Sequence, residues 1–233
     1  MKRLVAAVAV VTSLAIAGSA SAASKQLWHL TELDQAASEI AGVPITVVAS
    51  DSIPEWTALS GSDDVGGFTY LTANPDFHLF NPHDGGYYAA YHAVFLSPSI
   101  YETFRTDLAL ANPYDAAWAL LALDHESQHQ RLYSGDESRV NACALADMPR
   151  FTAKFITPTV VEDVQVPESY RAKVRYRKKV NGRWVWRSRY VTKVRYVTQQ
   201  QQTVANPAFT AVLAAAQAVY AQQPPPYNAG TCW

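Results

Sequence analysis

An apolar segment near the middle of the chain constrains its fold most strongly. Residues 116–123 read Ala-Ala-Trp-Ala-Leu-Leu-Ala-Leu and are apolar at every position. A helix of this composition has no polar face, so it must be buried in the interior of a domain. Asn112 and Pro113 precede it as a helix cap and a first helical residue, and Gly135 is a typical stop. The sequence therefore predicts a central helix over residues 113–133.

The end of this helix carries metal-binding side chains. His125 and His129 are four positions apart, which places both imidazoles on one helix face, one turn apart. Imidazole is a preferred donor to Zn²⁺, and a catalytic zinc takes three protein ligands and leaves one position for water. Glu126 can reach that water and act as its general base. The alternative is a surface helix with two solvated histidines, which the buried segment before them disfavours.

A third metal ligand must come from another part of the chain, and Glu137 is our choice. Eight positions separate it from His129, enough for a turn at Gly135 to bring a second helix back against the first, with Asp136 as its cap. Asn141 lies one turn beyond Glu137, where it can support a ligand through a hydrogen bond.

These residues carry a resemblance to a known family. His125-Glu126-x-x-His129, followed by Glu137 and a polar residue four positions later, resembles the gluzincin pattern of thermolysin-type peptidases, although that polar residue is Asp in gluzincins and Asn141 here. Residues 93–145, about a quarter of the chain, are also similar to minimal zincin-like domains of secreted actinobacterial proteins. The resemblance implies a zincin-like core. It also implies a strand near residues 91–97 at the edge of the cleft, where an extended peptide can bind by strand addition.

Other histidines are weaker candidates for the site. His29, His78, His83 and His92 each fit a structural or solvent-facing role on position alone. His83 and His92 flank a Gly-Tyr-Tyr loop, which makes these two the closest candidates. No residue that stabilises an oxyanion can be named from the sequence.

The first residues indicate export. Lys2 and Arg3 form a charged start, residues 4–18 form a short apolar stretch, and Ala20-Ser21-Ala22 offers a signal-peptidase site. We expect residues 1–22 to be a signal peptide. No later apolar run is long enough to cross a bilayer, so the expected mature protein is soluble, extracellular and bacterial.

Two cysteines remain in the expected mature chain, Cys143 and Cys232. In an oxidising compartment, an isolated pair more often forms a disulfide than a reactive thiol. We therefore expect a bridge between the C-terminus and the middle of the chain.

Charge is unevenly distributed along the chain. Residues 23–150 contain 17 Asp and Glu against 5 Lys and Arg, whereas residues 151–200 contain 12 Lys and Arg against 3 acids. Within residues 170–197, aromatic or apolar residues alternate with cations on both sides of Asn181-Gly182, a strong signal for a β-hairpin turn. This alternation predicts a hairpin with one aromatic face and one cationic face.

The hairpin has two interpretations. In the first, the aromatic face packs on the body of the protein while the cations are solvated or face its acidic part. In the second, the hairpin is an arm that binds an anionic partner. For an exported bacterial protein the plausible partners are cell-wall polymers or lipid headgroups, and export argues against nucleic acid.

The predicted fold is α+β: a small zincin-like core of an active-site helix and a short mixed sheet, with an inserted basic β-hairpin and a C-terminal helix. The predicted ranges are 1–22 for the signal peptide, 23–160 for the core, 161–200 for the hairpin, and 201–233 for the helix and tail packing on the core.

The predicted function is zinc-dependent hydrolysis of a peptide bond in a peptide or protein substrate. One alternative is a noncatalytic protein that binds the cell envelope or a polyanion and carries a structural or vestigial zinc site. Another is metal-assisted hydrolysis of a different bond.

Overall fold

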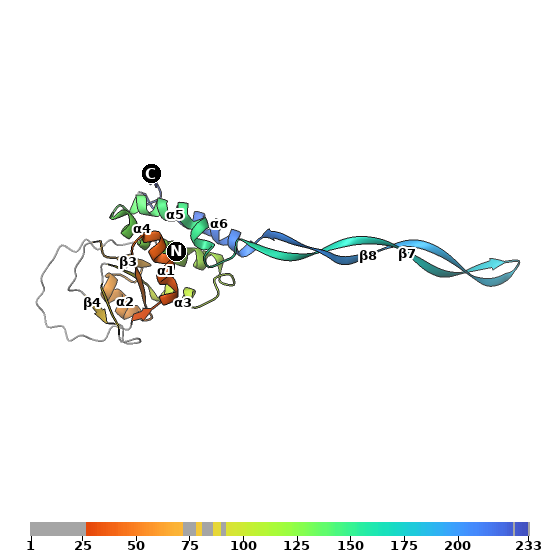
Figure 1. Ribbon diagram of the computed structural model, residues 1–233, viewed down its shortest axis with the longest axis horizontal. Helices are drawn as coiled ribbons and strands as arrows, with labels where there is room; N and C mark the ends of the chain where they lie inside the picture. Colours follow the sequence, from red (N-terminus) through yellow and green to blue (C-terminus); the bar gives the residue numbers. More distant parts are fainter. Residues whose placement is uncertain (1–26, 72–77, 81–85, 90–91, 226, 233) are drawn as a thin grey trace, which may run out of the picture. The chain divides into compact units, whose positions relative to one another are not determined.

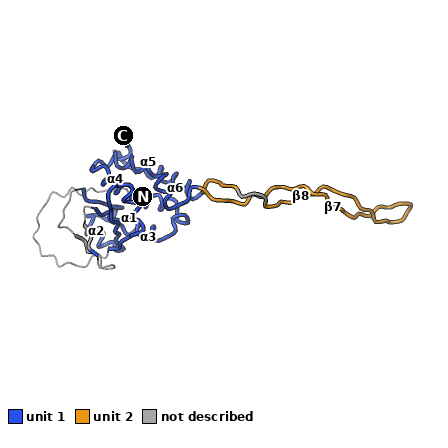
Figure 2. Tube along the Cα trace, in the orientation of Figure 1, with its two compact units in different colours: residues 1–158, 207–233 blue, residues 159–206 orange. Residues whose placement is uncertain are grey.

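The computed structural model describes residues 27–71, 78–80, 86–89, 92–225 and 227–232, and Figure 1 shows its elements. The predicted signal peptide and His83 lie outside the described residues. The chain forms two compact units, coloured separately in Figure 2: residues 1–158 with 207–233, and residues 159–206. The first unit is called the body and the second the ribbon.

The fold class is α+β, as predicted, with helices and small mixed sheets in the described residues. Six helices occur among the described residues: α1 (Thr31–Ala41), α2 (Ile53–Ser60), α3 (Pro98–Phe104), α4 (Pro113–Leu132), α5 (Glu137–Thr152) and α6 (Pro207–Ala221). None of the described helices is long and apolar enough to cross a membrane.

The predicted central helix is α4. Asn112 caps it, with its side-chain oxygen accepting a hydrogen bond from the Tyr114 backbone N–H at 2.9 Å, and Pro113 is the first helical residue. Every residue from 119 to 129 is buried. The helix packs against α1, α3, α5 and α6 and against the sheet, because an apolar surface on all sides requires neighbours on all sides.

The main sheet has four strands in the order β1-β2-β6-β3: β1 (Leu27–His29), β2 (Thr46–Ser50), β6 (Ala93–Leu96) and β3 (Gly67–Thr69). Strands β2 and β6 are parallel and the other pairs are antiparallel. A separate two-stranded sheet contains β4 (His78–Phe80) and β5 (Tyr87–Ala89).

The strand predicted at the edge of the cleft lies inside the sheet. Strand β6 pairs with β2 on one side and β3 on the other, so the edge strands of this sheet are β1 and β3. Apolar clusters cover both faces of β6: Val94 and Leu96 lie in one, and Ala93 and Phe95 in the other. A continuous apolar run is typical of a strand buried on both faces, and for this reason the edge placement of residues 91–97 is wrong.

Two local sequence patterns differ from the structure. The helical spacing of apolar residues from Trp28 to Ala41 favours a helix that starts at Trp28, but residues 27–29 form β1 because they pair with Val48–Ser50. The Ser-x-x-Glu spacing from Ser99 to Glu102 is typical of a capping box, but α3 begins at Pro98, after an N-cap residue, Ser97, whose side chain makes no capping hydrogen bond.

The ribbon consists of β7 (Thr159–Val180) and β8 (Arg183–Ala205), paired antiparallel along their length with one irregularity between Val164 and Gln165. Asn181 and Gly182 form the connection, with φ values of 48° and 82°. Positive φ at both central residues is what a type I′ turn requires, so the predicted Asn-Gly turn is confirmed. The ribbon is longer at each end than the hairpin predicted over residues 161–200.

The predicted division of the ribbon into an aromatic and a cationic face is wrong. Directly opposed residues of an antiparallel pair point to the same face, and Tyr170 lies opposite Lys193 while Arg177 lies opposite Trp186. Each face therefore mixes cations with rings. The two-residue turn places odd-numbered positions of β7 opposite even-numbered positions of β8. Because most cations occupy odd-numbered positions in both strands, these cations of β7 lie opposite the aromatic or polar residues of β8. The first interpretation, in which an aromatic face packs on the body, therefore has no basis in the strand register.

The predicted disulfide joins Cys143 in α5 to Cys232 in the C-terminal tail, with a Cα–Cα distance of 4.5 Å. The tail also lies close to the first turn of α5 at Gly230, where an added Cβ would overlap the Ser138 carbonyl oxygen. Only a residue without a side chain fits there. The tail thus fixes the end of α5 that carries Glu137.

We expect replacement of both Cys143 and Cys232 by Ala to lower the free energy of unfolding by about 2–4 kcal/mol, because the bridge closes a loop of 89 residues and restricts the unfolded chain. Urea unfolding of oxidised wild type, reduced wild type and the double variant measures this. Reduced wild type is the matched control and should unfold like the variant. Equal midpoints for all three would show that the bridge does not stabilise the body.

Candidate metal centre

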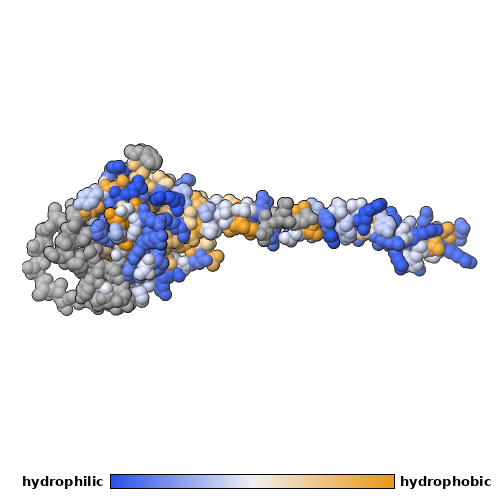
Figure 3. All heavy atoms as spheres, in the orientation of Figure 1, coloured by the Kyte–Doolittle hydropathy of each residue, from blue (hydrophilic) through white to orange (hydrophobic). Residues whose placement is uncertain are grey.

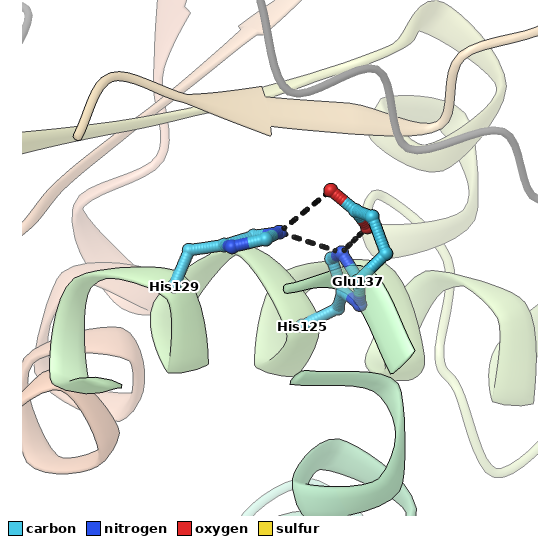
Figure 4. A group of neighbouring side chains, drawn as sticks. All are labelled: His125, His129 and Glu137. Atoms are coloured by element: carbon cyan, nitrogen blue, oxygen red, sulfur yellow. Dashed lines mark hydrogen bonds and ion pairs between the residues drawn. The ribbon is translucent and has the colours of Figure 1, made fainter. Parts of the chain in front are cut away.

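The last two turns of α4 place two imidazoles together in the core. His125 and His129 are each 1% exposed, and their Nε2 atoms are 2.9 Å apart. The spacing of four residues brings the rings to one helix face, as predicted. Figure 4 shows both rings directed at the same point in space.

A tight turn after α4 brings Glu137 back to these rings. The left-handed residue of the turn is Tyr133, with φ 47°, whereas Gly135 was expected to stop the helix. Backbone N–H groups of Tyr133 and Ser134 both donate to the His129 carbonyl, so the helix is closed before Gly135 is reached. Asp136 then caps α5 as predicted, accepting from the Arg139 backbone N–H at 3.2 Å.

The Glu137 carboxylate completes the cluster from the first position of α5. Its Oε2 is 3.0 Å from His125 Nε2, and its Oε1 is 3.4 Å from His129 Nε2. Figure 4 shows the carboxylate pointing between the two rings. Among the described residues this is the only group of three or more His, Cys, Asp or Glu side chains whose ligand atoms gather within 4.8 Å.

The spacing of these donor atoms fits a shared metal ion. Ligand atoms about 2.0–2.1 Å from one tetrahedral zinc ion lie about 3.3 Å from each other, and the three closest separations here are 2.9, 3.0 and 3.4 Å. Both Glu137 oxygens are buried and, apart from the two imidazoles, have no partner among the described residues. Buried polar atoms rarely lack partners, so these residues could hold a metal ion.

The turn also orients one of the two rings. His129 Nδ1 lies 2.6 Å from the Ser134 carbonyl oxygen. A ring nitrogen that donates to a carbonyl leaves the other nitrogen without a proton and free to bind a metal. This contact could not be predicted from the sequence, because its acceptor is the backbone oxygen of Ser134 and any residue supplies such an oxygen.

The predicted hydrogen bond from Asn141 to one of the three clustered side chains is not seen in the described part of the chain. Asn141 is buried in α5 one turn after Glu137, but within the described part of the chain no hydrogen bond joins it to any of the three ligands. His125 Nδ1 is buried and has no hydrogen-bond partner there either. The supporting role of Asn141 therefore stays a prediction.

Without a metal, the cluster holds charge in a low-dielectric interior. Burial alone would lower the pKa of His129, but the nearby carboxylates of Glu137 and Glu126 outweigh it and raise the pKa to about 9. Burial alone would raise the pKa of Glu137, but the two imidazoles lower it to about 2. Protons and a metal ion thus compete for the same nitrogen lone pairs.

Glu126 lies beside the cluster but is not part of it. Its Oε1 is 4.0 Å from His125 Nε2, its residue is 3% exposed, and burial raises its pKa. The edge strand β3 covers it closely: an added Cβ at Gly67 would be 3.1 Å from Glu126 Cγ. A larger residue than glycine at this position would displace the Glu126 side chain.

Gln130 joins the same edge strand to α4. Its side-chain N–H groups donate to Thr69 Oγ1 at 2.7 Å and to the Tyr70 carbonyl oxygen at 2.9 Å. Sequence reasoning missed both Gln130 and Gly67. The only available signal was their position in the sequence. Gln130 directly follows His129, and Gly67 is the second residue of a Gly-Gly pair at the start of a short strand.

The remaining histidines do not join the cluster in the described part of the chain. His29 Nε2 lies 2.7 Å from an Asp34 carboxylate oxygen, which is a structural role. His92 lies beside β6 and is not one of the three clustered residues. For His78 only the backbone is described, and His83 lies outside the described residues.

Comparisons with known proteins do not identify the site. No family model, no curated protein and no solved structure matches the chain. The metal centre is therefore inferred from the geometry of its side chains alone.

We expect the purified protein to bind one zinc ion per chain and to lose it when His125 is replaced by Ala, because the remaining two donors cannot complete the site. Elemental analysis after dialysis against a zinc buffer measures this. The matched control is His29→Ala, which removes an imidazole from the body but not from the cluster. Equal zinc content in both variants would show that His125 is not a ligand.

Proposed function

We propose that the protein is a secreted zinc-dependent metallopeptidase of the zincin-like type, with His125, His129 and Glu137 as metal ligands and Glu126 as general base. One observation carries the proposal: two imidazoles and a carboxylate converge on one point in the core, and a second carboxylate, that of Glu126, lies directly beside them. The Cys143–Cys232 disulfide is compatible with an oxidising, extracellular compartment.

In the proposed hydrolysis, the metal ion and the Glu126 side chain have different roles. A zinc ion at this site supplies a Lewis acid that activates water and polarises a carbonyl group. Glu126 accepts the proton of the attacking water at its carboxylate and can return it to the leaving amine nitrogen. Its burial beneath β3 keeps the carboxylate in one position and excludes bulk water from it.

Substrate binding is proposed at β3 rather than at residues 91–97. Strand β3 is paired with β6 on one side and has no partner strand on its other side among the described residues. An extended peptide that adds to this edge forms backbone hydrogen bonds without any requirement on sequence. Because Gly67 of β3 lies against Glu126, a peptide bound there runs past the general base.

The second candidate function is a noncatalytic protein that binds an anionic partner through the ribbon and holds a structural zinc ion. The concentration of cations in residues 170–195 favours it. The two functions differ in what Glu126 does, because a structural metal site does not need a general base.

We expect Glu126→Gln to reduce cleavage of a quenched fluorescent peptide library about a hundredfold or more, because the amide cannot accept the proton. Zinc content should stay at the wild-type value, since Glu126 is not among the three ligands. Glu102→Gln is the matched control, because it removes an exposed carboxylate from α3. A wild-type protein that is zinc-loaded and cleaves no more than Glu126→Gln would favour the noncatalytic function.

A further inference from the structure

The ribbon is divided into two parts of opposite charge. Residues 170–195, the basic half, contain 11 Lys and Arg and no Asp or Glu. Residues 159–169 and 196–205 contain three acids and no Lys or Arg. Arg195 forms an ion pair with Glu168 at 2.7 Å, at the junction of the two parts. The other ten cations have no acidic residue within the basic half to offset their mutual repulsion, and a bound polyanion would relieve it.

The strand register distributes these cations over both faces of the basic half. Five lie on one face, including Lys173 and Arg175, and six lie on the other, including Arg187 and Lys193. On the face that Figure 3 shows, hydrophilic residues gather near the turn. The ribbon is twisted (Figure 1), so a flat anionic surface such as a lipid bilayer meets only one side of it and leaves the cations on the opposite side turned away. A ligand that receives the ribbon between two rows of anionic groups contacts the cations of both faces.

Several cations are held in place by aromatic rings across the strands. The guanidinium carbons lie 5.2–5.6 Å from ring centroids in four pairs: Arg171 with Tyr190, Arg177 with Trp186, Arg189 with Tyr176, and Arg195 with Tyr170. Stacking restricts the arginine side chains before a ligand arrives, so less entropy is lost on binding. A stacked guanidinium still presents N–H donors that match the geometry of a phosphate group.

The dimensions of the basic half match a groove of duplex nucleic acid. The major groove of B-form DNA is about 12 Å wide and admits a two-stranded β-ribbon. Residues 170–180 of β7 extend about 37 Å at about 3.4 Å per residue, close to the length of one turn of duplex. Phosphates line both walls of such a groove, where cations on both faces of a ribbon can reach them.

We infer that the basic half of the ribbon is a nucleic-acid-binding arm that enters a groove of a duplex and binds phosphates along both walls. The inference does not depend on the metal centre or on peptidase activity. It differs from the cell-wall polymers and lipid headgroups that the sequence favoured, because the expected single cationic face does not exist. Exported protein would meet such a duplex outside the cell.

The test compares two double variants that each remove two cations from one face. Lys173→Gln with Arg175→Gln changes the first face, and Arg187→Gln with Lys193→Gln changes the second. Each pair contains one Lys and one Arg, and none of the four stacks on a ring in the pairs above. The matched control, Arg105→Gln with Arg139→Gln, removes two exposed cations from the body.

Binding of the full mature chain to a labelled DNA duplex, about three helical turns long, is measured by fluorescence anisotropy over a range of salt concentrations. We expect each double variant of the ribbon to weaken binding about tenfold and to lower the slope of log Kd against log salt by about two, because two phosphate contacts are lost. The control should bind like wild type. Circular dichroism and zinc content verify that each variant is folded.

Three results would overturn the inference. The first is no binding of the duplex by wild type. The second is an effect of only one of the two ribbon variants, which would indicate a flat ligand. The third is competition by polyglutamate or by vesicles of anionic phospholipid as effective, per charge, as that by unlabelled duplex, which would indicate a general polyanion or a membrane surface.

Discussion

Ionisable groups buried in an apolar core are costly unless they share their charge with each other or with a cation. His125, Glu126 and His129 directly follow the buried apolar segment of α4 and are each at most 3% exposed. The segment that places them there is the run of Ala and Leu before them, which must be buried on every side. The core therefore both positions the donors and requires a partner for them. Glu137 supplies one such partner, and a metal ion bound by the three side chains would complete it.

The elements around the centre restrict its geometry from three directions. The turn at Tyr133 returns the chain so that Glu137 is the first residue of α5, and its Ser134 carbonyl orients the His129 ring. Gly230 and the disulfide fix the tail against α5. The Gln130 side chain donates a hydrogen bond to Thr69 of β3 and so holds this strand over Glu126. These contacts hold the donor atoms at fixed separations, which is the condition for selective metal binding and for a general base that acts at one position.

The parts predicted from the sequence depend on local geometry, and those that were missed depend on pairing between distant segments. The spacing of His125 and His129 fixes their common face, and a short turn is enough to bring Glu137 to them. Strand β1 was read as the start of a helix because its partner, β2, lies about twenty residues away. The place of β6 inside the sheet likewise depends on β3. The mixed faces of the ribbon were predictable, because a two-residue turn fixes which positions oppose each other.

The central claim is that His125, His129 and Glu137 bind one metal ion together. X-ray absorption at the zinc edge of the zinc-loaded protein tests it directly, because it reports the atoms bound to the metal and their distances. The account predicts two imidazole nitrogens and additional oxygen ligands at about 2.0–2.2 Å, with one imidazole lost in the His129→Ala variant. A spectrum without imidazole scattering, or one unchanged in that variant, would contradict it.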